Sequence, residues 1–217
     1  MAKIELVIFD LAGTTVKDEG VVQSVFSQTL SSYGISFHSK DLVPFRGASK
    51  RELMRKFAPP EERSDEVYRA FCAKLAEQFS THGVHEMEGT SATFLQLKEK
   101  GILIALNTGF DRVITELVLT EIRWDRRLFR AIVCGDDVAR GRPAPDMILR
   151  AMEICEVKDS AHVANVGDTV FDLQAGSNAS VRFNIGVLSG AHTREQLQLQ
   201  PHTHLIPTVQ QLPSEII

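Results

Sequence analysis

The sequence has few cysteines, no long apolar run and no excess of basic residues. Its 217 residues include three cysteines, Cys72, Cys134 and Cys155, which are odd in number and widely spaced. This excludes a disulfide framework and a paired-cysteine metal site, and it favours a reducing compartment. The apolar run at residues 4–9 is far too short to cross a bilayer, and no signal-peptide pattern is present, so we expect a cytoplasmic protein without a membrane partner.

The overall charge and composition also narrow the function. A net charge of −4 provides no positive field for nucleic acid, so we expect no nucleic-acid partner. The hydrophobic fraction of 43% and the charged fraction of 24% are ordinary for a globular protein. A chain of 217 residues is long enough for one large domain or for one domain with an insertion.

Apolar, β-rich runs alternate with helical patterns along most of the chain. The runs lie at residues 4–9, 102–106, 131–134, 163–166 and 182–187. Helical periodicity lies between them, at residues 91–100, 112–120, 145–155 and 172–178. This alternation predicts an α/β fold with a parallel sheet covered by helices on both faces.

The segment between the first two predicted strands is too long for one crossover connection. It contains three helical patterns, at residues 21–33, 50–57 and 61–81, and no comparable strand. Because a single crossover helix needs far fewer residues, we predict a helical insertion at residues 17–87. The remaining segments, 1–16 and 88–217, are predicted to form the sheet domain.

Polar side chains follow four of the predicted strands where each strand ends. In α/β proteins, sites form at the carboxyl ends of parallel strands, so we expect these side chains to meet at one edge of the sheet. They are Asp10 and Thr14 after the first strand, Thr108 after the second, Arg142 after the third, and Asp168 and Asp172 after the fourth.

This combination of residues suits phosphoryl transfer. Asp10 can attack phosphorus and form an aspartyl-phosphate. Mg²⁺ prefers hard oxygen ligands, so Asp10, Asp168 and one backbone carbonyl can hold it. Thr108 and the amides of the Gly13 loop can bind phosphate oxygens, and Arg142 can neutralise their charge.

Each of these residues alone also fits a purely structural role. An aspartate at a strand end often caps a turn, Thr108 fits a helix N-cap, and Arg142 fits a surface turn. Four such coincidences at four successive strand ends favour the catalytic interpretation.

Together, the four segments resemble the haloacid dehalogenase superfamily of aspartate-nucleophile hydrolases over nearly the whole chain. The resemblance implies a Rossmann-like parallel sheet with a helical cap inserted after the first strand. It implies that Asp10 is the nucleophile, that Asp10, the Ala12 carbonyl and Asp168 bind Mg²⁺, and that Asp172 supports the metal site. The implied phosphate-binding residues are Ala12, Gly13, Thr14, Thr108, Gly109 and Arg142.

Two departures from the usual pattern indicate the phosphonatase branch of the superfamily. Most phosphatases of the superfamily have a second aspartate two residues after the nucleophile, which protonates the leaving alkoxide, and this chain has Ala12 there. The usual lysine of the third motif is replaced by Arg142. The strings DLAGTTV, GRPAP and GDTVFDL resemble this branch, whose type member is phosphonoacetaldehyde hydrolase.

The resemblance also implies a role for a lysine in the insertion. In the phosphonatase branch a cap lysine forms a Schiff base with the substrate aldehyde, so the carbon leaving group needs no acid at position 12. Lys50 matches this lysine, with Gly47 three residues before it. A structural alternative is that Lys50, Arg51 and Arg55 belong to a basic, solvated helix face.

Three positions depart from the phosphonatase pattern. Its cysteine, histidine and aromatic hydroxyl are replaced here by Gly20, Leu53 and Phe110. These replacements argue against phosphonoacetaldehyde as the substrate and indicate a sister group rather than the type enzyme itself.

Three functions follow from these residues. The leading interpretation is a Mg²⁺-dependent hydrolase of a small phosphonate or organophosphate, acting through an aspartyl-phosphate, with C–P cleavage through Lys50 as its sharper form. A P–O phosphatase for compounds with good leaving groups explains Ala12 without Lys50. A catalytically inactive phosphate-binding regulator is the third, but it does not need the retained Asp10 and metal acids.

The first predicted helix of the insertion has an apolar stripe. It consists of Val21, Val22, Phe26 and Leu30, at helical spacing. Cap helices of this branch pair into dimers, so the stripe fits either a homodimer through the cap or the core of the cap itself.

Overall fold

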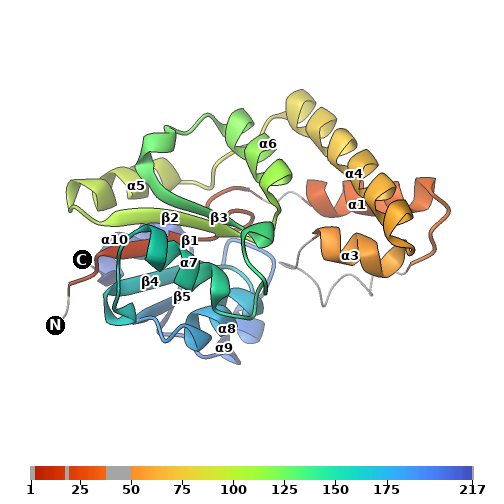
Figure 1. The fold of residues 1–217 in the computed structure, drawn as a ribbon. Coiled ribbons are helices and arrows are strands. Elements are labelled where there is room, and N and C mark those ends of the chain that lie inside the picture. Colours follow the sequence, from red (N-terminus) through yellow and green to blue (C-terminus); the bar gives the residue numbers. More distant parts are fainter. Residues whose placement is uncertain (1–2, 18–19, 38–49, 217) are drawn as a thin grey trace.

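The computed structural model describes residues 3–17, 20–37 and 50–216, and these contain a six-stranded parallel sheet (Figure 1). The strand order β3-β2-β1-β4-β5-β6 confirms the predicted α/β fold with a Rossmann-like sheet. The strands are β1 (Leu6–Phe9), β2 (Leu103–Thr108), β3 (Phe129–Cys134), β4 (Val163–Gly167), β5 (Phe183–Val187) and β6 (His204–Ile206).

The central strand β1 is buried on both faces. Its side chains alternate between two apolar clusters, with Val7 and Phe9 in one and Leu6 and Ile8 in the other. A continuous apolar run is the pattern expected for a parallel strand covered on both sides. The burial of β1 therefore fixes the position of the residue that follows it, Asp10.

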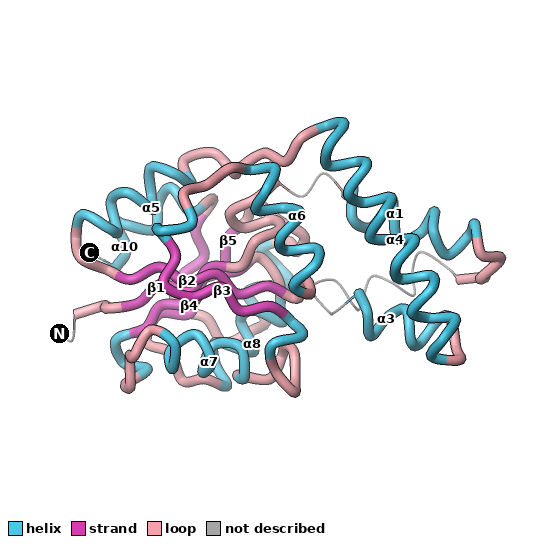
Figure 2. The backbone as a smooth tube through the Cα atoms, turned by 45° about the horizontal axis from the view of Figure 1, so that its top comes forward, coloured by secondary structure: helices cyan, strands magenta, loops and turns pink. Residues whose placement is uncertain are grey.

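Helices cover both faces of the sheet (Figure 2). The face with Val7 and Phe9 is covered by α5 (Thr90–Glu99), α6 (Arg112–Ile122) and α10 (Leu212–Ile216). The opposite face is covered by α7 (Asp146–Ile154) and α8 (Val170–Asn178). Shorter helices are α9 (Arg194–Gln198), η2 (Arg126–Leu128), η3 (Gly135–Asp137), η4 (Ser160–His162) and η5 (Val209–Gln211). In the part of the chain that the structure describes, no helix could cross a membrane.

The insertion after β1 is helical, as predicted. It contains α1 (Val21–Ser32), α3 (Lys50–Phe57) and α4 (Glu61–His82), which lie to one side of the sheet (Figure 1). Phe26 of α1 packs edge-on against Phe71 of α4, with ring centroids 5.7 Å apart. Phe26 and Leu30 are buried, so the core of the insertion accounts for these two residues of the apolar stripe. The domain boundaries at residues 17 and 87 and the homodimer stay predictions.

The two linkers that join the insertion to the sheet domain run side by side. The Lys17 amide donates to the His85 carbonyl (2.9 Å), and the Met87 amide donates to the Thr15 carbonyl (2.8 Å). Between them, Val16 and Glu86 form an antiparallel bridge. The insertion therefore leaves and rejoins the sheet domain at one place.

Candidate active site

Asp10 is held at the carboxyl end of β1 by the backbone around it. Its amide donates to the Val166 carbonyl of β4 (2.9 Å), which keeps Asp10 in line with the sheet. The next residues turn sharply, because the Leu11 carbonyl accepts hydrogen bonds from the amides of Thr15 (2.9 Å) and Val16 (2.8 Å). The Thr15 hydroxyl donates to the Asp10 carbonyl (2.8 Å). The Asp10 carboxylate thus projects from a fixed backbone.

Asp168, after β4, lies in a cradle of glycines and hydrogen-bond donors. Its carboxylate accepts from the Thr14 hydroxyl (3.2 Å) and from the Ala191 amide (2.6 Å). A Cβ atom at Gly13 or Gly190 would lie 2.4 or 2.0 Å from its Oδ2. Gly13 also has a φ of +87°, a conformation that other residues rarely adopt. Both positions therefore require glycine.

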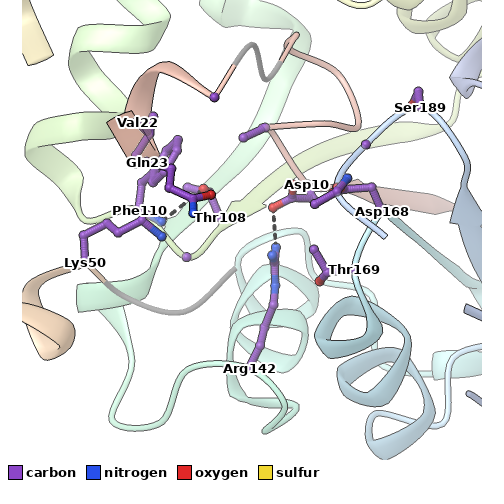
Figure 3. A pocket seen from close by; sticks show the side chains of 15 residues that line it. Asp10, Val22, Gln23, Lys50, Thr108, Phe110, Arg142, Asp168, Thr169 and Ser189 are labelled. Atoms are coloured by element: carbon purple, nitrogen blue, oxygen red, sulfur yellow. Dashed lines mark hydrogen bonds and ion pairs between the residues drawn. The ribbon is translucent and has the colours of Figure 1, made fainter. Parts of the chain in front are cut away.

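Arg142 is buried and contacts two of the acids, Asp10 and Asp172, and Figure 3 shows the contact with Asp10. Its Nη2 lies 2.8 Å from Oδ1 of Asp10, and its Nη1 lies 2.7 Å from Oδ1 of Asp172. Nη2 also donates to the Asn107 side-chain oxygen (2.6 Å). Only 2% of the Arg142 side chain is exposed, so its charge acts on these carboxylates with little screening by water. The predicted contact of Arg142 with a substrate phosphate stays a prediction.

Asp172 uses both carboxylate oxygens within the protein. Oδ1 contacts Arg142, and Oδ2 accepts from the Thr169 amide (2.9 Å) and hydroxyl (2.5 Å). Thr169 is the N-cap of α8, and its hydroxyl also accepts from the Asp172 amide (3.2 Å). These contacts fit the supporting role expected of Asp172 beside a metal ion.

Burial disfavours the charged form of the carboxyl groups. It raises the pKa of Asp10 to about 7, an effect that Arg142 opposes and Asp172 reinforces. Burial, Asp10 and Asp172 together raise the pKa of Asp168 well above its usual range. Oxygens of the three carboxylates lie within 4.8 Å of one another. A divalent cation would relieve their repulsion, and a set of hard oxygen donors fits Mg²⁺.

A cavity of about 280 Å³ lies above these residues, between the sheet domain and the insertion. The sheet domain contributes Asp10, Ala12, Thr108, Gly109, Arg142 and Asp168 to its lining, and the insertion contributes Gly20, Val22, Gln23 and Lys50. In Figure 3, Lys50 and Gln23 lie beside Phe110 on one side, and Asp10, Arg142 and Asp168 lie on the other. The structure therefore brings most of the predicted site residues to one cavity.

The remaining predicted residues lie beside the cavity or outside the described part of the chain. Gly13 lies close against the Asp168 carboxylate, and the Thr14 hydroxyl donates to it. The Thr108 hydroxyl accepts a hydrogen bond from the Phe110 amide (3.2 Å). Leu53, one of the three departures from the phosphonatase pattern, is buried in the apolar core. Gly47 lies outside the described residues.

Sequence reasoning missed two groups of residues that line the cavity. The first is the loop after β5, with Ser189, Gly190 and Ala191. The strand-end rule applied to the fifth strand would have pointed to this loop. The second is Val22 and Gln23 on α1, whose direction depends on how the insertion packs and has no signal in the sequence.

Comparisons with known proteins agree with this geometry. The chain is 31% identical over 208 residues to phosphonoacetaldehyde hydrolase of Bacillus cereus strain G9842, covering 87% of this chain and 77% of that protein. It is 30% identical over 182 residues to pyrophosphatase PpaX of Bacillus mycoides, covering 83% and 82%. A phosphonoacetaldehyde hydrolase like protein from Oleispira antarctica has the same fold, with a TM-score of 0.84 at 21% identity over 99% of this chain and 92% of that one. Residues 7–185 match the family model described as haloacid dehalogenase-like hydrolase, and with the relatives above this match makes the chain a hydrolase that belongs to this family.

Proposed function

We propose that the protein hydrolyses a small phosphonate or organophosphate with the help of Mg²⁺, through a phosphoryl-Asp10 intermediate. The observation that carries the proposal is the position of Asp10. It stands at a strand end, lines a cavity of about 280 Å³, and shares that cavity with Asp168 and Arg142. The names of the two relatives, phosphonoacetaldehyde hydrolase and pyrophosphatase, support a phosphorus compound as substrate.

In the first step, Asp10 attacks phosphorus. Arg142 holds Oδ1 of Asp10 at 2.8 Å, so attack falls to Oδ2. The bond from oxygen to phosphorus forms as the bond to the leaving group breaks. Water then attacks the acyl phosphate, releases phosphate and restores the carboxylate. Asp10, Asp168 and the Ala12 carbonyl would hold Mg²⁺, which screens the phosphoryl charge from these acids.

Other residues of the site would bind the phosphoryl group. Thr108 and Gly109 line the cavity beside Asp10, where a hydroxyl and an amide can meet phosphate oxygens. Arg142 would neutralise part of the negative charge that develops on those oxygens. Gly13 and Thr14 would act mainly through Asp168, which they contact.

Ala12 lines the cavity and cannot donate a proton. The leaving group must therefore be one that departs without a proton from this position. Lys50, in the same lining, favours a carbonyl phosphonate. The Lys50 amine would condense with the carbonyl and release water. The C–P electron pair would then pass into the resulting iminium to give an enamine, which takes up a proton before water frees the product.

A second candidate is a P–O phosphatase for compounds with good leaving groups. The observation that favours it is the chemistry of two other residues that line the cavity, Gly20 and Phe110. Neither can titrate, although the phosphonatase pattern has reactive groups at both positions. In this case Lys50 binds substrate through its charge alone.

The decisive experiment is a screen of small phosphonates, phosphate esters and acyl phosphates with Mg²⁺, read by phosphate release. We expect at least one compound to be hydrolysed, and we expect Asp10→Asn or chelation of the metal to abolish release. Turnover that survives Asp10→Asn would contradict the aspartyl-phosphate. No turnover of any compound would favour the phosphate-binding regulator.

Borohydride separates the two kinds of cleavage. With a carbonyl phosphonate that the enzyme turns over, a reduced adduct on Lys50 supports imine chemistry. Absence of the adduct, together with turnover of phosphate compounds by Lys50→Ala, supports P–O cleavage.

A further inference from the structure

The insertion gives the cavity a wall with a different chemistry from the catalytic wall. The catalytic wall is rich in negative charge, from Asp10 and Asp168, and Arg142 already contacts two carboxylates. The opposite wall offers the Lys50 ammonium and the Gln23 carboxamide (Figure 3). A ligand that presents phosphorus to Asp10 therefore presents its other end to Gln23 and Lys50.

Gln23 lies in the first turn of α1, and its side chain is partly buried in the cavity lining. Within residues 3–17, 20–37 and 50–216, no hydrogen bond holds the Gln23 carboxamide. A carboxamide carries two N–H donors and one acceptor oxygen. Its place in the lining makes these groups available to a ligand.

The surroundings of Gln23 select the kind of group that it can bind. Val22 and Phe110 line the cavity next to it and offer no side-chain hydrogen bond. Lys50 supplies a positive charge and further donors. Because both polar groups of this wall can donate, the favoured partner is an oxygen that accepts hydrogen bonds.

We propose that Gln23, together with Lys50, binds a carbonyl or carboxylate oxygen at the non-phosphorus end of the substrate. Gln23 is then a specificity-determining residue, and the substrate is a small organophosphorus compound with such an oxygen. The cavity of about 280 Å³ suits a small molecule. This inference rests on the proposed function, because it assumes that phosphorus faces Asp10.

Direct binding tests the inference without relying on turnover. Calorimetry with the full chain and Mg²⁺ would compare phosphonoacetate and 2-oxopropylphosphonate, which carry the oxygen, with propylphosphonate, which lacks it. We expect Gln23→Leu to weaken binding of the oxygen-bearing ligands by about tenfold and to leave propylphosphonate unchanged. Gln28→Leu is the matched control, because Gln28 lies on the same helix and hydrogen-bonds only Ser24 within the described part of the chain.

A second variant separates the two kinds of oxygen. Gln23→Glu adds a negative charge, so it should weaken binding of phosphonoacetate, whose carboxylate it repels, more than binding of 2-oxopropylphosphonate, whose carbonyl is neutral. Equal affinities of the variant and the wild type for phosphonoacetate would show that residue 23 does not contact this end of the ligand.

Two negative results have different meanings. A wild-type protein that binds all three phosphonates equally, with no effect of Gln23→Leu, overturns the role of Gln23 alone. A wild-type protein that binds neither inorganic phosphate nor any of the three phosphonates overturns the proposed function and this inference with it.

Discussion

The position of the Asp168 carboxylate depends on neighbouring glycines, which have no Cβ atom. Gly13 and Gly190 leave room for it, and the Ala191 amide holds its Oδ2 at 2.6 Å. The close approach of the Gly190 backbone means that even a methyl group cannot be added without moving the loop or the carboxylate. The proposed metal site should therefore be sensitive to the smallest change at this glycine.

Gly190→Ala should weaken Mg²⁺ binding at least about tenfold, which corresponds to about 1.4 kcal/mol. The added Cβ would lie 2.0 Å from Oδ2 of Asp168, so the carboxylate must leave its position. Calorimetric titration with Mg²⁺ measures the effect. Gly141→Ala is the matched control, because its Cβ would meet nothing within 4 Å. Equal affinities in the two variants would contradict the cradle.

The residues of the cavity that the sequence pointed to are those whose side chains have distinctive chemistry. Asp10, Thr108, Arg142 and Asp168 stand out because acids, hydroxyls and a guanidinium at strand ends are distinctive. The Ala191 amide does not stand out, because every residue except proline has one. The strand-end rule can point to the loop after β5, but it cannot identify which backbone amide or which glycine of that loop contacts Asp168.

At the scale of secondary-structure elements, the N-cap of helix α8 both starts the helix and contacts a residue of the candidate site. Its N-cap, Thr169, exchanges hydrogen bonds with Asp172, and Asp172 contacts Arg142. The cap that starts the helix is therefore also the support for the residue that holds Asp10.

Thr169→Ala should lower the free energy of unfolding by about 1–2 kcal/mol and also reduce turnover about tenfold or more. The second effect arises because Asp172 loses a hydrogen-bond partner and no longer fixes Arg142. Urea unfolding and phosphate release measure the two effects. Thr193→Ala provides the comparison, because Thr193 caps the exposed start of α9 with the same motif. It should cost about 1 kcal/mol and leave turnover unchanged. A similar loss of turnover in both variants would show that capping acts only through stability.

Elements were predicted well where the apolar pattern is long. The helices of the insertion and the five longer strands lie within a few residues of their predicted ranges. Strand β6 was missed because His204–Ile206 is a three-residue edge strand with too few residues to show a pattern. The start of α8 was predicted two residues late, at residue 172, whereas the helix begins at Val170, directly after its N-cap Thr169.

At the scale of the whole molecule, the strand order assembles the site. Strand β1 lies between β2 and β4, with Phe9 beside Leu106 and Val166. Asp10, Thr108 and Asp168 therefore all lie at the same edge of the sheet, at the carboxyl ends of three neighbouring strands. In the absence of a cation, repulsion among these buried acids lowers the stability of the fold. Because the acids titrate, this loss of stability depends on pH.

Without Mg²⁺, the protein should become less stable as the pH rises from about 4 to about 7. Asp10 has a pKa of about 7 in the folded protein and about 3.9 in the unfolded chain. A carboxyl with a raised folded pKa stabilises the fold below its unfolded pKa, and this contribution is lost as the pH rises through the folded value. The loss is on the order of 2–4 kcal/mol.

Urea unfolding in the presence of a chelator measures this pH dependence. The Asp10→Asn variant should show a smaller decrease over the same range, because the titrating carboxyl is absent. Added Mg²⁺ should restore stability most at the higher pH, where the acids are ionised. A decrease that is identical in the wild type and in Asp10→Asn would assign it to other groups.

The two hydrogen-bonded linkers determine how the insertion could be removed or replaced, in evolution or by design. Because Thr15 and Met87 are hydrogen-bonded neighbours, the two ends of the intervening segment already lie together. A short hairpin turn could close that gap, or another helical segment with adjacent ends could be spliced in, without changing the path of the sheet. The junction thus allows the sheet-domain residues of the site to be kept while the helical insertion is exchanged as one unit.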